Sequence, residues 1–167
     1  MTGALVDIPR DTIVVAPAGD KFTVQDIGSG VAVFAFDPAT NSVGVLYATL
    51  PASPGSAQGG PGRYANSGVK ALIEQLTAKG TTPNNLKVAI IGAAESIVGT
   101  PDEFDSLASR TLKAVSQGLS NHGIQGIFEQ TGGFLGRTVS FDSESGAVSI
   151  KDFRDKEEVV CNLRGNE

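Results

Sequence analysis

Apolar residues follow two different periods along this chain, and each period predicts a different kind of element. Residues 12–16, 30–36 and 43–50 are apolar runs rich in β-branched and aromatic side chains, which predict three strands. A polar turn at Asn41 and Ser42 makes the last two a hairpin. Because residues 30–36 and 43–50 are apolar at nearly every position, we expect both faces of these strands to be covered.

A helical period replaces the strand pattern over residues 65–79 and again over residues 102–121. The first segment carries one apolar stripe, formed by Val69, Leu72, Ile73 and Leu76. The second carries a stripe formed by Ala108, Leu112, Val115 and Leu119. Gly80 and Gly123 follow as stop signals. Two amphipathic helices that pack against a sheet are therefore predicted.

The remaining apolar runs predict further strands over residues 86–92, 124–130, 137–142 and 147–152. The charged tail, residues 153–167, has room for one short strand at 159–163, and the segment 51–62, rich in proline and glycine, reads as a surface loop. This order of elements predicts an α/β (α+β) fold: one layered domain over residues 1–167, with mixed or antiparallel sheets and two main helices packed against them.

Composition removes several classes of function. The 167 residues are 40% hydrophobic and 19% charged, as expected of a globular chain. A net charge of -5 argues against nucleic acid as a partner. The apolar runs are too short for membrane insertion, and the first residues lack the features of a signal peptide, so a cytoplasmic location is expected. One cysteine and one histidine exclude a zinc site of the usual ligands, and we expect no metal and no cofactor.

The residues Asp26 to Gly30 place Ser29 between two glycines, a pattern with two readings. A phosphate-binding loop would need a helix after it, whereas a strand is predicted here. A nucleophile elbow would also need a histidine base, but we expect His122, the only histidine, to cap the end of the second helix. On spacing alone, a tight entry into the strand is favoured.

Longer stretches of sequence resemble the CheD family of chemoreceptor glutamine deamidases. The residues that carry the resemblance are IGSGVAVFAFDP, GVLYATLP, GRYANSGVKALIEQL, KVAIIGAAES and EQTGGFLGRTVSFDSESGAVSI, in order over residues 12–152. The resemblance implies a CheD-like layered fold. In that family a cysteine attacks the side-chain amide of a receptor glutamine, a histidine serves as base and a threonine orients the pair. The glutamine becomes glutamate and ammonia leaves.

The catalytic residues of the family are missing at the matching positions. The cysteine position falls on Gly30, the histidine position on Tyr47 and the threonine position on Val24. Glycine offers no nucleophile, valine forms no hydrogen bond, and a phenol with a pKa of about 10 is a poor base at neutral pH. We therefore expect a pseudoenzyme with a sealed or repurposed cleft that is smaller and less polar than the family's, although the family itself is a protein-glutamine glutaminase.

Three functions stay open. The first is binding without catalysis to the cytoplasmic region of a chemoreceptor or to a CheC-like protein. The second is an active amidohydrolase in which Ser29 or a displaced residue supplies the nucleophile, since the lone thiol, Cys161, lies outside the matched region. The third is a binding protein outside chemotaxis. The binding candidates are Gly28, Ser29, Gly30, Tyr47, Arg63, Tyr64, Thr131, Gly132, Gly133 and Arg137.

Overall fold

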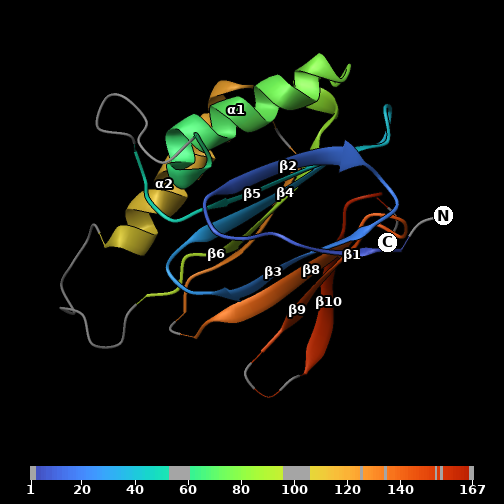
Figure 1. Cartoon of the computed structure of the whole chain (residues 1–167). Helices are drawn as coiled ribbons and strands as arrows, with labels where there is room; N and C mark the ends of the chain where they lie inside the picture. The colour runs from blue at the N-terminus through green and yellow to red at the C-terminus, as the bar shows by residue number, and fades with distance from the viewer. Residues whose placement is uncertain are drawn as a thin grey trace.

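Two five-stranded sheets and a pair of helices form three layers in the computed structural model (Figure 1). The structure describes residues 3–52, 61–95, 106–124, 126–133, 135–152, 154 and 156–165. The helix-covered sheet has the order β2 (Thr12–Pro17), β5 (Ser42–Ala48), β4 (Val31–Asp37), β6 (Lys87–Gly92) and β7 (Gly126–Thr131). The outer sheet has the order β1 (Leu5–Asp7), β3 (Lys21–Ile27), β8 (Arg137–Asp142), β9 (Ala147–Lys151) and β10 (Glu157–Asn162).

Both sheets are mixed, as predicted. Neighbouring strands are antiparallel except for the β1–β3 and β6–β7 pairs, which are parallel. The helices α1 (Ala65–Ala78) and α2 (Leu107–Asn121) cover one face of the helix-covered sheet, and the outer sheet covers the other (Figure 1). Short 3-10 turns at Pro61–Arg63 and Pro83–Asn85 precede α1 and β6. No helix in the described part of the chain has the length and apolar character to cross a membrane.

Strands β4 and β5 are buried along their whole length, which confirms that both of their faces are covered. Alternate residues serve two separate cores. Val31 and Val33 pack toward the helices, whereas Phe34 and Phe36 pack toward the outer sheet. Both phenylalanine rings meet Phe141 of β8 edge to face, at centroid distances of 6.0 and 6.2 Å.

The predicted helical stripes face the core. All four stripe residues of α1 are buried, and Gly44 of β5 lets this helix approach closely, because a Cβ atom there would lie 2.7 Å from Cδ1 of Leu72. Three of the four stripe residues of α2 are buried and Leu112 is half-buried. The start predicted for this helix, residues 102–105, lies outside the described residues. His122 is the C-cap, as predicted, with Nδ1 2.9 Å from the Gly118 carbonyl oxygen.

Two strands of the outer sheet, β1 and β3, were not predicted. In β3 the pairing register with β8 shifts between Val24 and Ile27, and Asp26 has a left-handed backbone with φ of 55°. This bulge interrupts the two-residue alternation by which a strand is recognised. β1 has only three residues, too few to show any period.

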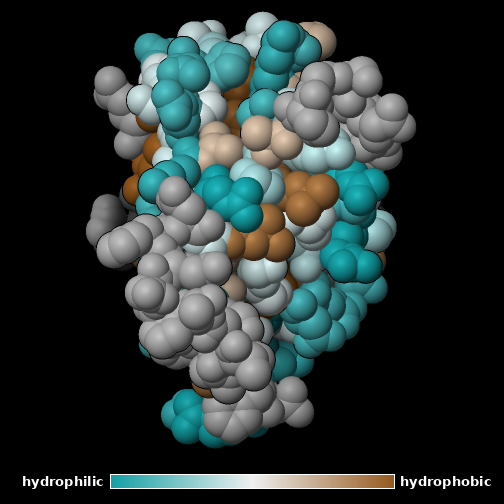
Figure 2. Space-filling view, turned by 90° about the vertical axis from the view of Figure 1, so that its left-hand side faces the viewer, coloured by the Kyte–Doolittle hydropathy of each residue, from teal (hydrophilic) through white to brown (hydrophobic). Residues whose placement is uncertain are grey.

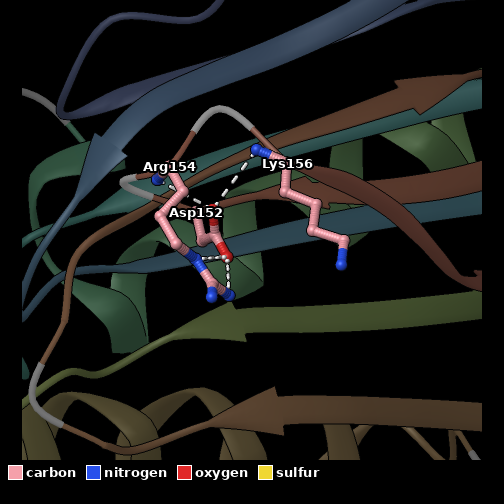
Figure 3. A network of polar contacts seen from close by, with 3 residues as sticks. All are labelled: Asp152, Arg154 and Lys156. Carbon is pink, nitrogen blue, oxygen red and sulfur yellow. Dashed lines mark hydrogen bonds and ion pairs between the residues drawn. The ribbon is translucent and has the colours of Figure 1, made fainter.

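The charged tail is part of the fold, because β10 completes the outer sheet in the region where a short strand was predicted. The connection from β9 to β10 is held by Asp152, whose carboxylate accepts hydrogen bonds from the backbone N–H groups of Arg154 and Lys156 and from the Arg154 guanidinium (Figure 3). After β10, Arg164 donates to the Ser143 carbonyl and lies 4.6 Å from the centroid of the Phe36 ring. The tail therefore contacts both sheets.

The crossing of α1 and α2 depends on a small residue. A Cβ atom at Gly118 would lie 2.9 Å from Cγ1 of Val69. Gly118→Val should therefore overpack this contact and lower the free energy of unfolding by about 1–3 kcal/mol, measured by urea denaturation. Adding Val69→Ala should make the double variant less destabilised than the sum of the single changes. Simple additivity would contradict the close helix contact.

Candidate functional site

A cleft lies where β3 leads through Gly28, Ser29 and Gly30 into β4. It has a volume of about 750 Å³. Its lining residues are Arg10, Asp11, Gln25, Asp26, Gly28, Ser29, Gly30, Tyr47, Thr49, Leu50, Arg63 and Leu107. They come from the β1–β2 connection, the end of β3, the loop after it, the end of β5, the turn before α1 and the first residue of α2. Figure 2 shows the left-hand side of the molecule in Figure 1, where hydrophobic side chains lie near the middle and hydrophilic ones lie above them and to their right.

Gly30 and Tyr47, the positions at which the sequence resemblance predicts the family's nucleophile and base, lie side by side. A Cβ atom at Gly30 would be 3.0 Å from Cε1 of Tyr47, 3.0 Å from the Ala48 carbonyl oxygen and 3.4 Å from the Thr49 methyl. The tyrosine side chain is only 5% exposed. Its ring therefore fills the space next to the missing side chain.

Val24, the third matching position, lies on the facing sheet. It is fully buried, pairs with Val139 of β8 and belongs to the same apolar core between the sheets as Tyr47. The three positions thus come from both sheets, and Val24 and Tyr47 belong to one apolar core. The chemistry available at these three positions is limited to the phenol of Tyr47.

The Tyr47 hydroxyl group lies in a charged environment. Burial raises the pKa of the phenol above its ordinary value of 10.0; Arg10 lowers this pKa, and Asp11 and Asp26 raise it. The phenol therefore keeps its proton at neutral pH and can serve as a hydrogen-bond donor. It cannot act as a base there.

Asp11 and Thr49 form a polar pair that the sequence did not reveal. The Thr49 hydroxyl donates to Oδ1 of Asp11 at 2.6 Å, and the Asp11 N–H donates to the Tyr47 carbonyl oxygen at 2.7 Å. Asp11 has a left-handed backbone, with φ of 63°. Thr49 stands two residues after Tyr47 in the matched segment, so strand alternation could have indicated it. Nothing local indicates Asp11, because it reaches the cleft only through the crossing from one sheet to the other.

The cleft is open, so of the two alternatives expected, a sealed or a repurposed cleft, the sealed one is wrong. Four charged residues line it: Arg10, Asp11, Asp26 and Arg63. The apolar replacements Val24 and Tyr47 fill the space between the sheets, whereas these charges come from loops and strand ends at the mouth. The packing change is therefore compatible with an accessible polar cavity.

Ser29 lies in the cleft without a histidine near it. It is partly exposed, whereas His122 follows the last residue of α2, a helix of 15 residues whose first residue, Leu107, lines the cleft. At 1.5 Å per residue, the length of this helix separates His122 from the cleft by roughly 20 Å. Cys161 lies in β10, and burial raises the pKa of its thiol to about 11, which disfavours the nucleophilic thiolate.

The other predicted binding residues divide into two groups. Arg63 is exposed and lines the cleft, with its guanidinium carbon 6.0 Å from the centroid of the Tyr64 ring. Tyr64 itself is 8% exposed and is the N-cap residue of α1, so its ring is largely committed to packing. The second group lies outside the cleft lining: Thr131 ends β7, Gly132 and Gly133 lie in the β7–β8 connection, and Arg137 begins β8.

Arg137 lies on an interior strand and is not a solvated charge at the edge of a sheet. β8 lies between β3 and β9 inside the outer sheet. The guanidinium is half-buried and donates to three backbone carbonyls, and burial lowers its pKa. Gly132 and Gly133 have positive φ values of 89° and 72°, as a turn that favours glycine requires.

The charge environment of Tyr47 can be tested by titration. The chain has two tyrosines and no tryptophan, so a Tyr64→Phe variant leaves one phenol to follow by ultraviolet absorbance. We expect its pKa to lie above 10.0, to rise further with Arg10→Gln and to fall with Asp26→Asn. A Tyr47 pKa below the ordinary value would contradict the buried placement.

Comparison with known proteins gives a consistent result. Residues 49–152 match the family described as CheD chemotactic sensory transduction. The chain is 29% identical over 136 residues to the probable chemoreceptor glutamine deamidase CheD of Natronomonas pharaonis, covering 81% of both chains. It is 31% identical over 139 residues to that of Desulforamulus reducens, covering 82% of this chain and 84% of the relative.

The chemoreceptor glutamine deamidase CheD of Thermotoga maritima is 31% identical over 125 residues, covering 75% of this chain and 77% of the relative. Among solved structures, the hypothetical protein YfiH of Bacillus licheniformis shows a looser likeness, with a TM-score of 0.46 and 13% identity over 71% of this chain and 49% of that chain. The family match covers more than half of the sequence and includes both helices and strands β6 to β9. The chain therefore belongs to the CheD family, chemotaxis proteins related to the chemoreceptor glutamine deamidases.

Proposed function

We propose that this chain is a CheD-family protein that acts by binding rather than by deamidation. Its partner is the cytoplasmic region of a chemoreceptor or a CheC-like protein, and a cytoplasmic location follows from either partner. The proposal rests on one observation, the close contact between Gly30 and the ring of Tyr47. This ring belongs to a protonated phenol, and it occupies the space beside the position where the nucleophile is missing.

The chemical argument concerns the two steps of amide cleavage. Attack on an amide carbon needs an electron pair from a thiolate or an activated hydroxyl, and Gly30 has neither. A base must also take up a proton, and the raised pKa of Tyr47 excludes this role at neutral pH. Loss of a general base alone typically slows catalysis by about 10²- to 10⁴-fold.

The binding argument concerns the cleft that remains. It is open and about 750 Å³ in volume, and its lining includes two arginines, Arg10 and Arg63, and two aspartates, Asp11 and Asp26. Leu107 adds an apolar side chain that is 37% exposed. Exposed leucine and arginine side chains around a concave surface are suited to a protein segment, since such interfaces combine an apolar centre with a polar rim.

The Asp11–Thr49 pair favours a second candidate, slow amide hydrolysis by a substitute hydroxyl. Thr49 Oγ1 would attack the amide carbon while Asp11 takes the hydroxyl proton; ammonia would leave, and water would then cleave the ester. The methyl of Thr49 lies near the missing side chain of Gly30, and its hydroxyl already donates to Asp11. We rank this second because a carboxylate is a much weaker base than an imidazole. Binding to a partner outside chemotaxis is the third candidate.

Ammonia release distinguishes the first two candidates. We expect the wild-type chain to bind a glutamine-containing receptor cytoplasmic fragment in calorimetry and to release no ammonia from it above the background of the fragment alone. Ser29→Ala and Thr49→Val should leave this result unchanged. Turnover in the wild type that either substitution abolishes would replace binding with catalysis as the function.

Restoring the thiol alone should not restore activity. Gly30→Cys places its Cβ atom against the Tyr47 ring and the Ala48 carbonyl and leaves the new thiol with no imidazole beside it. We expect no deamidation of the receptor fragment and a lower free energy of unfolding. The change Gly30→Cys with Tyr47→His serves as the comparison, because it provides both space and a base. Deamidation by Gly30→Cys alone would contradict the proposed reason for inactivity.

A further inference from the structure

The guanidinium group of Arg137 donates hydrogen bonds to backbone carbonyls in and beside the connection between β7 and β8. Nη1 donates to the Gln130 carbonyl at 3.3 Å, and Nη2 donates to the carbonyls of Leu135, at 3.2 Å, and of Gly132. Within the described part of the chain, this arginine has no carboxylate partner. A half-buried arginine that is satisfied by carbonyls fixes backbone geometry, since its planar fork presents donors in set directions.

Backbone hydrogen bonds continue from this connection to the end of β6. The Gly132 N–H donates to the Gly92 carbonyl at 3.0 Å, and the Glu95 N–H donates to the Gly133 carbonyl at 2.7 Å. Both acceptors and one of the donors belong to residues with positive φ, namely Gly92, Gly133 and Gly132. The position of residues 92–95 is therefore coupled to the loop that Arg137 holds.

The same segment supports the floor of the cleft. The Ala93 N–H donates to the Gly30 carbonyl at 2.8 Å, and the Ala94 N–H donates to the Gly28 carbonyl at 2.9 Å. A Cβ atom at Gly92 would collide with the Gly30 carbonyl oxygen, so the two backbones touch directly. Four backbone hydrogen bonds thus connect the loop held by Arg137 to both glycines beside Ser29.

We propose that Arg137 is a positioning residue for the cleft: it sets the conformation of residues 28–30 through Gly132, Gly133 and residues 92–95, although it does not line the cleft itself. Only the importance of this positioning for a partner rests on the proposed function. This role requires an arginine, because its guanidinium group contacts three separate carbonyls and a lysine at the same position could not reach all three.

Hydrogen exchange of backbone amides tests this proposal without any ligand. In Arg137→Ala, the amides of Ala93, Ala94, Glu95 and Gly132 should exchange about tenfold faster or more, while the amides of β4 and β5 stay protected. Arg154→Ala is the matched control, because it removes one arginine from the exposed β9–β10 turn. Arg137→Lys should behave like the alanine variant, since it keeps the charge and loses the fork.

Guanidinium ion provides a rescue that a general loss of stability would not show. Arg137 also lines a hollow of about 700 Å³ on the outer sheet, through which a small cation can reach the vacated position. Guanidinium at concentrations well below denaturing ones should slow the exchange of Ala93 and Ala94 in Arg137→Ala, but not in Arg154→Ala. If the Arg137→Ala variant unfolds, the amide exchange rates of Ala93 and Ala94 in Arg137→Lys test the proposal in its place.

Two results would overturn the proposal: unchanged exchange at Ala93 and Ala94 in both Arg137 variants, or wild-type protection in Arg137→Lys. Calorimetry with the receptor cytoplasmic fragment distinguishes failure of this proposal from failure of the proposed binding function. If the wild type does not bind, the proposed partner is wrong, and the exchange data still decide the role of Arg137.

Discussion

The complete burial of β4 and β5 is the constraint on which the site depends. These strands lie between the helices and the outer sheet, so each of their apolar side chains belongs to one of two cores. Gly30 immediately precedes β4, and Tyr47 stands near the end of β5, where it pairs with Ala32. A change of side chain at either position is therefore a change in packing as well as in chemistry.

This constraint explains how the three replacements fit together. A polar triad at the end of a buried layer must satisfy its hydrogen bonds at the cost of desolvation. Here Val24 lies fully buried in the core between the sheets, and the Tyr47 ring fills the space beside Gly30. The remaining polar groups, such as Asp11 and Thr49, lie at the mouth of the cleft, where water can solvate them. With Val24 and Tyr47 at these positions, the inner part of the site is core, whereas its entrance is open.

Sequence periodicity was sufficient for elements that bury a regular stripe, and it failed where the backbone is irregular. The stripes of α1 and α2 and the apolar runs of β4 and β5 identified these elements to within a few residues. β3 escaped because its bulge at Asp26 breaks the alternation. Motif spacing brought Gly30 and Tyr47 together correctly. Motif spacing could not identify Asp11, because this residue reaches the cleft only where the chain crosses from one sheet to the other. It also could not show that Arg137 lies on an interior strand, because that depends on the order of strands in the sheet.

Shape and chemistry have separate origins in this cleft. Its floor is fixed by hydrogen bonds from backbone N–H groups of Ala93 and Ala94 to the carbonyls of Gly30 and Gly28, in which no side chain takes part. The chemistry of the family, by contrast, depends on side chains that project from this backbone. Loss of those side chains removes a reaction, whereas the hydrogen-bonded floor and the charged mouth persist. This separation supports the binding role proposed above, because holding a partner requires the floor and the charged mouth, whereas converting it requires a nucleophile as well.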